Sequence, residues 1–455
     1  MDPFASALEQ AAAVRRREVS ARELVDMYLE RIARDGGRTN AFWLTTPELA
    51  RSQADEELPE GPLAGACTSV KELAPMAGFP INYGSRAFQR QIAERDHFVV
   101  TKIKAAGCPI LGRTTTPELG SRPVTEFGLH GATRNPWSLD HTSGGSSGGA
   151  AAALAAGLCA WSHGTDGGGS VRIPASCCGV VGLKPSRGRI SMGPVIGEGW
   201  AGLSTPGVIT RTVQDAGAAL DALAGHLPGD PYWAESRGSF LEAARQAPDR
   251  LRIGVQVDAE SEVHSELVDL VREVAGRLES LGHQVEEAGP DTRPFRSAQE
   301  TIVAAGTASY DIEDLSVLDP LNAWLLEQSR RLTAADYVRA VNTVRTQSRL
   351  VVAFWDDHDV LLTPTLTQPP FELGHFGGDP ERAVAEGFDW LCFTYPYNCT
   401  GQPAISLPLG HSFRGLPLGV QLVGPPRGEA LLLALAEQLE KDRPWAHRLP
   451  PDSLA

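Results

Sequence analysis

Two glycine-rich turns that each contain serine are the parts of this chain best suited to chemistry. The first turn holds Ser146 and Ser147 between two pairs of glycines, and the second is Gly167–Ser170. Consecutive glycines let several backbone N–H groups converge on one point, which is how an oxyanion hole is built. A serine in the same turn could attack a carbonyl group whose oxygen lies in that hole. The two turns therefore predict acyl-transfer chemistry at a serine.

A serine nucleophile also needs a base, and Lys71 is a candidate. It ends a short apolar run, residues 66–70, that has the character of a buried strand. Burial lowers the pKa of a lysine, and a neutral lysine can replace histidine as the base. A lysine at the end of a strand can equally extend its amine into solvent. The residues alone leave these two roles open.

The first turn has a second interpretation. Gly144–Gly148 fits G-x-S-x-G, the nucleophile elbow of α/β-hydrolases. That motif needs a strand directly before it, whereas residues 134–143 are rich in turn formers. It also needs an aspartate and then a late histidine, and the candidates His375 and His411 lack any flanking signature. The elbow is therefore the weaker of the two interpretations.

Other glycine and cysteine patterns give little support for a cofactor or a metal. Gly197–Gly202 fits a dinucleotide fingerprint by spacing only, since Trp200 crowds it and no strand–helix context surrounds it. The seven cysteines show no C-x-x-C spacing, and the adjacent Cys177 and Cys178 do not suit zinc. We expect no metal, no cofactor and reduced thiols. A glycine and alanine segment that serves packing alone remains the structural alternative.

Helix and strand patterns alternate along the chain, which predicts the α/β class. Ser20–Glu23 fits a capping box before an amphipathic helix. A segment rich in proline, glycine and charge, residues 226–250, precedes a strand–helix–strand unit. Residues 368–388 are rich in glycine and proline, and we expect a loop there.

Composition excludes some functions. The chain has 455 residues and a net charge of −15, which argues against a nucleic-acid partner. No apolar run is long enough for a membrane span, and the first residues lack a signal pattern. We therefore expect a cytoplasmic protein with neither nucleic acid nor a membrane as partner.

Long stretches of the chain resemble the amidase signature family of serine hydrolases. The resemblance runs from about residue 5 to about residue 440 and implies one large domain over 1–455, with a mixed central sheet flanked by helices on both faces (α/β/α). Within it we expect an N-terminal helical arm (about 1–60), a signature core (about 61–225) and a C-terminal part (about 250–445). Helices in 295–358 would cover the substrate. The matching motifs are GPLAGACTSVKELAPMAGFPINYGS, TSGGSSGGAAAALAAG, HGTDGGGSVRIPASCCGVVGLKPS and FTYPYNCTGQPAISLPLG.

The resemblance also implies roles for single residues. The family's catalytic triad is a serine, a second serine beside a cis peptide bond and a lysine, and the matching positions are Ser170, Ser146 and Lys71. The Gly145–Ser146 bond should then be cis. The remaining implied roles are N–H groups of Gly167, Gly168, Gly169 and Ser170 in the oxyanion hole, Gly120 in the substrate pocket, and Asp166 and Arg172 as braces of the nucleophile turn.

The chain departs from the family pattern at two places and leaves its substrate open. Ser143 replaces the usual proline, and Gly167 stands where a larger residue is common, which predicts a roomier pocket or a more flexible turn. Several segments look like nylon-oligomer hydrolases, which open cyclic amides. We expect a small-molecule amide as substrate and leave a homodimer open. The alternative is an amidotransferase subunit or a biosynthetic acyl-transfer enzyme, because the triad does not distinguish water from an amine as acceptor.

Overall fold

One mixed sheet runs through the computed structural model, which describes residues 1–451. Neighbouring strands are antiparallel in the middle of the sheet, and parallel pairs lie toward both ends. Strands from the first half of the chain meet those of the second half where β7 pairs with β12. The spatial order is β1 (Phe42–Thr45), β3 (Ile110–Thr114), β2 (Thr68–Lys71), β6 (Trp161–Asp166), β8 (Thr205–Thr210), β7 (Val181–Lys184), β12 (Ala404–His411), β13 (Pro417–Val423), β11 (Val360–Pro364), β9 (Arg252–Val255) and β10 (Gln284–Glu287).

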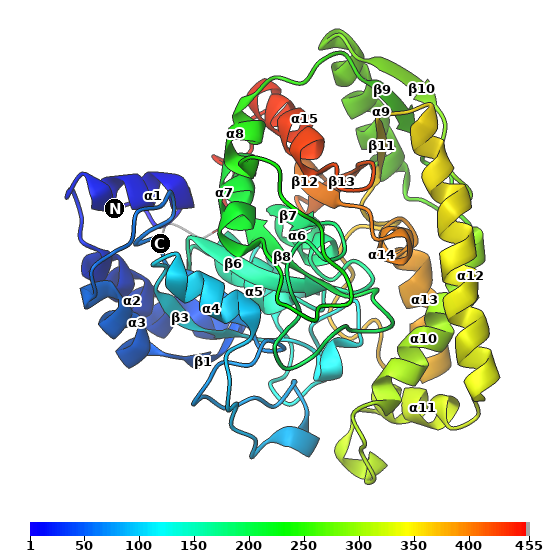
Figure 1. Cartoon of the computed structure of the whole chain (residues 1–455), viewed down its shortest axis with the longest axis horizontal. Coiled ribbons are helices and arrows are strands. Elements are labelled where there is room, and N and C mark those ends of the chain that lie inside the picture. The colour runs from blue at the N-terminus through cyan, green and yellow to red at the C-terminus, as the bar shows by residue number, and fades with distance from the viewer. Residues whose placement is uncertain (452–455) are drawn as a thin grey trace.

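Helices cover both faces of this sheet, which confirms the expected α/β/α layers (Figure 1). On one face, α5 (Gly148–Ala155) packs against β2, β3, β6 and β8, and α6 (Arg172–Cys178) packs against β7, β12 and β13. The other face is covered by α7 (Val213–Leu223), α9 (Ser265–Ser280) and α15 (Glu429–Asp442), and α8 (Phe240–Arg245) packs on α7 and α15. The first part of the chain adds α1 (Ala7–Arg15), α2 (Ala21–Thr39), α3 (Pro47–Asp55) and α4 (Phe98–Ala105).

A separate group of helices lies to one side of the sheet, at the right in Figure 1. Their buried residues form an apolar cluster distinct from the main core. The helices of residues 295–358 belong to this group and are α10 (Arg296–Ala308), α11 (Pro320–Ser329) and α12 (Ala334–Val352). The group also contains α13 (Pro380–Trp390) and α14 (Pro396–Thr400).

Local sequence explains how the first turn is positioned. Helix α5 begins at Gly148 and consists almost entirely of glycine and alanine. A Cβ atom at Gly149 would lie 2.5 Å from the backbone nitrogen of Thr115, so only glycine allows this approach to the end of β3. The small residues let α5 press against the sheet and hold the serines that precede it over the strand ends.

Two local expectations are wrong. Residues 368–388 are not all loop, because α13 begins at Pro380. Asp379 caps it by accepting from the N–H of Glu381, and proline is favoured at a first helical position. Residues 134–143 are not only turn, because β4 (Arg134–Asn135) and β5 (Ser138–Thr142) pair as a hairpin outside the central sheet. Both segments are rich in turn-forming residues, so their composition did not indicate the short helix and the short strands that they contain.

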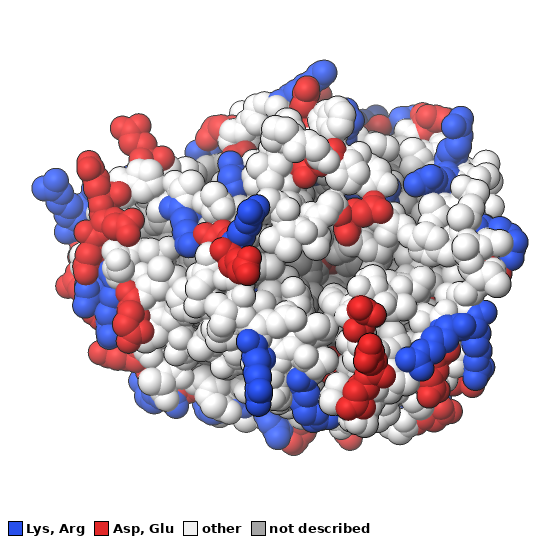
Figure 2. Space-filling view, turned by 60° about the horizontal axis from the view of Figure 1, so that its bottom comes forward, with Lys and Arg blue, Asp and Glu red and all other residues white. Residues whose placement is uncertain are grey.

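The charge of the molecule is dispersed over the face shown in Figure 2. Acidic and basic residues are interspersed there, and a hollow on this face is bordered mainly by uncharged residues. Within residues 1–451, no helix is both long enough and apolar enough to cross a bilayer.

Candidate active site

Lys71 lies at the carboxyl end of β2 and is fully buried. Its Nζ is 2.7 Å from Ser146 Oγ and 2.9 Å from Thr165 Oγ1. Burial lowers the pKa of Lys71 to about 7, against the opposing effect of the Asp166 carboxylate. The amine therefore does not reach solvent, and a neutral fraction exists near neutral pH. This is the state in which it can accept a proton.

Ser146 is held from several sides. The Gly145–Ser146 peptide bond is cis, as the resemblance implied. The Ser146 carbonyl accepts a hydrogen bond from Thr116 Oγ1 at 3.0 Å. The backbone N–H of Ser147 donates to the carbonyl of Ser170 at 3.1 Å, which joins the first turn to the second.

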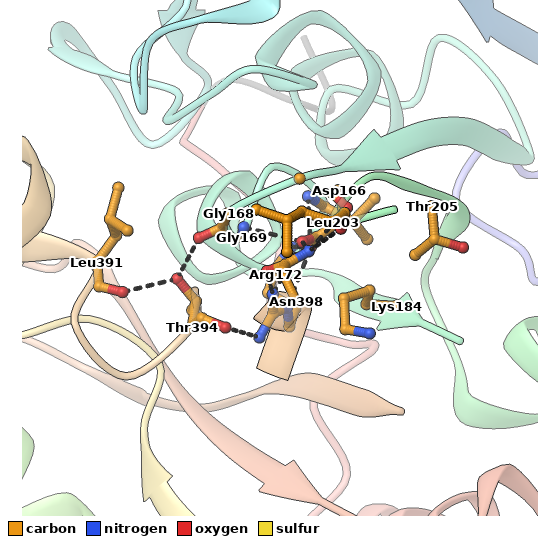
Figure 3. A network of polar contacts seen from close by, with 12 residues as sticks. Asp166, Gly168, Gly169, Arg172, Lys184, Leu203, Thr205, Leu391, Thr394 and Asn398 are labelled. Carbon is orange, nitrogen blue, oxygen red and sulfur yellow. Dashed lines mark hydrogen bonds and ion pairs between the residues drawn. The ribbon is translucent and has the colours of Figure 1, made fainter. Parts of the chain in front are cut away.

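The second turn, Gly167–Ser170, is braced by a buried ion pair (Figure 3). Asp166 ends β6, and its carboxylate accepts two hydrogen bonds from the Arg172 guanidinium, at 2.8 Å and 3.0 Å. Burial alone would raise the pKa of Asp166, but the charge and hydrogen bonds of Arg172 hold it well below its usual range. The expected brace is thus present. Arg172 also donates to the carbonyl of Thr394, to Asn398 and to Gln421 in the C-terminal part.

Three side chains from the C-terminal part fix the carbonyl groups of this turn. Asn398 Nδ2 donates to the carbonyl of Asp166 at 2.8 Å, Gln299 Nε2 to that of Gly167 at 3.3 Å, and Thr394 Oγ1 to that of Gly168 at 2.7 Å. Because a trans peptide group is planar, fixing its carbonyl fixes the opposite direction of the next N–H. The turn is therefore pre-oriented before a substrate binds.

The N–H groups of the turn divide into two kinds. That of Gly169, which we also expected in the oxyanion hole, donates to Asp166 Oδ1 at 2.8 Å. Those of Gly167, Gly168 and Ser170 have no acceptor within residues 1–451. These three are the donors available to a developing negative charge, while Gly169 serves the brace.

Two cavities meet at this turn. The larger cavity has a volume of about 680 Å³ and the smaller cavity one of about 460 Å³. Gly120, Ser170 and Trp200 line both of them. Gly120 thus borders both cavities, and the substrate contact expected of it stays a prediction. The space on each side of Ser170 can hold part of a small molecule.

The space beside Gly167 is not free. A Cβ atom on Gly167 would lie 2.8 Å from Cε3 of the Trp200 indole, so that ring occupies the place of the missing side chain. The expectation that glycine here makes the pocket roomier is wrong. Sequence reasoning missed this contact because Trp200 reaches the turn from a distant loop.

Several other candidates lie away from the two cavities. His375 stacks on Phe371 and His411 packs against Trp137, and neither histidine lines either of these two cavities. The turn at Gly144 follows a hairpin and not a strand of the central sheet. Both findings speak against the α/β-hydrolase elbow. Within residues 1–451, no cluster of three or more His, Cys, Asp or Glu is arranged to hold a metal ion.

Apart from Asp166 and Arg172, the residues that orient the two turns were not identified individually from the sequence. A signal existed for Thr394 and Asn398, which lie in the quoted stretch FTYPYNCTG, and for Thr165, which lies in HGTDGGGS. No motif marked Gln299. Its contact depends on how α10 packs over the turn.

Comparison with known proteins identifies the family. The Amidase family model matches residues 23–433. This chain belongs to the amidase family. Relatives of this amidase include the 6-aminohexanoate-cyclic-dimer hydrolase of Paenarthrobacter ureafaciens, 36% identical over 99% of this chain and 97% of the relative. The acylamidase of Rhodococcus erythropolis is also 36% identical, over 99% of this chain and 98% of the relative.

Solved structures agree with the sequence matches. The structure of 6-aminohexanoate cyclic dimer hydrolase complexed with substrate superposes with a TM-score of 0.95 at 34% identity, over 99% of both chains. This amidase therefore shares its fold with that hydrolase over nearly its whole length. It is a hydrolase that acts on carbon–nitrogen bonds other than peptide bonds. The matches do not favour the amidotransferase or biosynthetic alternative.

Proposed function

We propose that this amidase cleaves a carboxamide through a covalent acyl-enzyme on Ser170, with Ser146 as proton relay and Lys71 as base. The observation that carries the proposal is the fully buried Lys71 amine, 2.7 Å from Ser146 Oγ, beneath a cavity that Ser146 and Ser170 both line. The lone pair of neutral Lys71 takes the proton of Ser146, and Ser146 takes that of Ser170. The Ser170 oxygen then forms a bond to the amide carbon.

The negative charge that develops on the carbonyl oxygen needs donors already in place. The free N–H groups of Gly167, Gly168 and Ser170 supply them in this proposal. As the tetrahedral intermediate collapses, the C–N bond breaks, Ser146 gives a proton to the departing nitrogen, and Lys71 returns its proton to Ser146. Water repeats the sequence on the acyl-enzyme and releases the carboxylic acid.

A fluorophosphonate probe followed by peptide mapping tests this assignment. We expect the probe to bond to Ser170 and the Ser170→Ala variant to remain unlabelled. A label found on Ser146 or Ser147 would reverse the proposed roles. Added hydroxylamine should capture the acyl group as a hydroxamate, and failure to capture it with a good substrate would argue against a covalent intermediate.

We also propose a reducing, cytoplasmic setting and a small-molecule amide substrate. All seven cysteines are free thiols, which supports the setting because disulfides are rare in reducing compartments. Relatives named for a cyclic amide and for acylamides support the substrate class.

A further inference from the structure

Trp200 lines both cavities, as Gly120 and Ser170 also do, and its indole is the largest of these three side chains. Its indole spans the gap between the nucleophile turn and α10. A Cβ atom at Gly167 would lie 2.8 Å from the six-membered ring, and one at Gly306 would lie 2.4 Å from Cδ1 of the five-membered ring. A glycine at each end of the indole therefore makes room for it. Any other residue at either position would displace the ring.

The backbone around Trp200 is also unusual. Trp200 and Ala201 both have φ of 52°, in the left-handed region that non-glycine residues rarely adopt. Such a conformation costs roughly 1–2 kcal/mol per residue. The loop is thus strained at the residue whose indole lines both cavities.

The chemistry of the turn distinguishes the two sides of Trp200. Ser146 lines the larger cavity and not the smaller cavity. The group that protonates the departing nitrogen must come within hydrogen-bond reach of it. The nitrogen, and any substituent on it, therefore lies on the side of the larger cavity. The acyl group is left with the smaller cavity.

The walls suit uncharged groups on both sides. Around the larger cavity stand aromatic and aliphatic side chains, and burial lowers the pKa of His97 to about 4, so that this residue is neutral. The charged residue there, Glu198, is exposed. The aromatic and aliphatic residues of this wall include Tyr83, Met192, Val195, Ile196, Tyr310 and Tyr337.

The smaller cavity is similar. Its apolar walls include Ile173, Trp324 and Phe388. Its buried cation, Arg122, is paired with Asp319, and its other charged residues are half-buried or exposed.

A primary amide would release ammonia and leave the larger cavity unused.

We propose that Trp200 partitions the active site, and that the substrates are N-substituted amides with an uncharged apolar group on each side of the scissile bond. The amine half occupies the larger cavity and the acyl half the smaller cavity. This inference rests on the proposed acyl-enzyme chemistry, because the role of Ser146 decides which half lies where.

Two homologous series of uncharged amides test the assignment. One consists of acetamides with a lengthening N-alkyl group, the other of N-methylamides with a lengthening acyl chain. Ala305→Phe narrows the larger cavity and Val384→Phe the smaller one, which makes them a matched pair. We expect Ala305→Phe to lower kcat/KM by about tenfold or more for acetamides with long N-alkyl groups, and not for N-methylamides with long acyl chains. Val384→Phe should lower kcat/KM for N-methylamides with long acyl chains, and not for acetamides with long N-alkyl groups. The opposite pattern would overturn the assignment.

Variants of the partition test Trp200 itself. Trp200→Ala joins the cavities. The longest N-alkyl group and the longest acyl chain that the enzyme accepts should then become similar in length. Gly306→Ala should also reduce the difference in accepted chain length between the two series, because it displaces the indole. Trp200→Phe should keep part of that difference. Unchanged limits in Trp200→Ala would overturn the partition. Fluorophosphonate labelling of Ser170 shows in each case that the variant is folded.

The same labelling separates this inference from the proposed function. An enzyme that is labelled at Ser170 but hydrolyses neither series refutes the substrate class alone. An enzyme without a label at Ser170 refutes the acyl-enzyme as well.

Discussion

At the scale of single residues, the charge state of Lys71 controls the proposed reaction. Burial lowers its pKa to about 7, and the base form is the neutral one. We therefore expect kcat/KM to rise with pH through about 7 and to level off above it, because kcat/KM reports ionisations of the free enzyme. Values of kcat/KM measured from about pH 5.5 to about pH 9 with an uncharged amide would show this rise and the plateau above it. A flat profile across that range would exclude Lys71 as the titrating base.

A lysine-to-arginine substitution gives the matched control. Arginine keeps a positive charge throughout the accessible pH range and has no neutral form to act as a base. Lys71→Arg should therefore lose nearly all turnover at every pH in the profile. Recovery of turnover at high pH in this variant would mean that another group accepts the proton.

At the scale of secondary-structure elements, α11 is tied to the signature core by a buried cluster. Asp319 caps α11 by accepting from the N–H of Leu321 at 2.9 Å, and it pairs with Arg122 at 2.5 Å. Breaking a buried ion pair by removing one partner costs roughly 3–5 kcal/mol. We expect Asp319→Ala to lower the free energy of unfolding by about this amount, measured by urea denaturation. Because α11 lines the smaller cavity, KM should also rise for amides with long acyl chains.

Two further variants separate the ion pair from the cap. Asp319→Asn keeps an oxygen that can cap the helix and loses the charge, so it should fall between Asp319→Ala and the natural protein. Asp291→Ala removes an exposed ion pair with Arg293 and should change stability little. Equal effects of Asp291→Ala and Asp319→Ala would show that burial does not decide the cost.

The elements also show what sequence patterns can predict. The capping box at Ser20, the unit β9–α9–β10 and the strand that ends at Lys71 are local patterns, and each is present in the structure. Helix α13 was missed because glycine and proline around it masked a short amphipathic segment. The order of the strands, with β12 beside β7, and the position of Trp200 against Gly167 depend on contacts between distant segments. The roles of the three triad residues are implied by the family resemblance, because the spacing of these residues does not by itself identify them.

At the scale of the whole molecule, the two halves of the chain share one sheet and one active site. Strand β7 pairs with β12 through Gly182, Leu183 and Lys184. The nucleophile turn belongs to the first half, whereas Thr394 and Asn398, which fix its carbonyl groups, belong to the second. Neither half can therefore complete the sheet or the site alone.

A split chain tests this dependence. Arg237 and Gly238 are exposed and precede α8, so a break after Gly238 leaves both halves with intact elements. We expect fragments 1–238 and 239–455 to be poorly folded separately, because each would expose an unpaired central strand, β7 or β12. Expressed together, they should co-elute on size exclusion and regain fluorophosphonate labelling at Ser170. If fragment 1–238 alone were folded and labelled at the rate of the full chain, the contacts from Thr394 and Asn398 would not be needed to form the nucleophile turn.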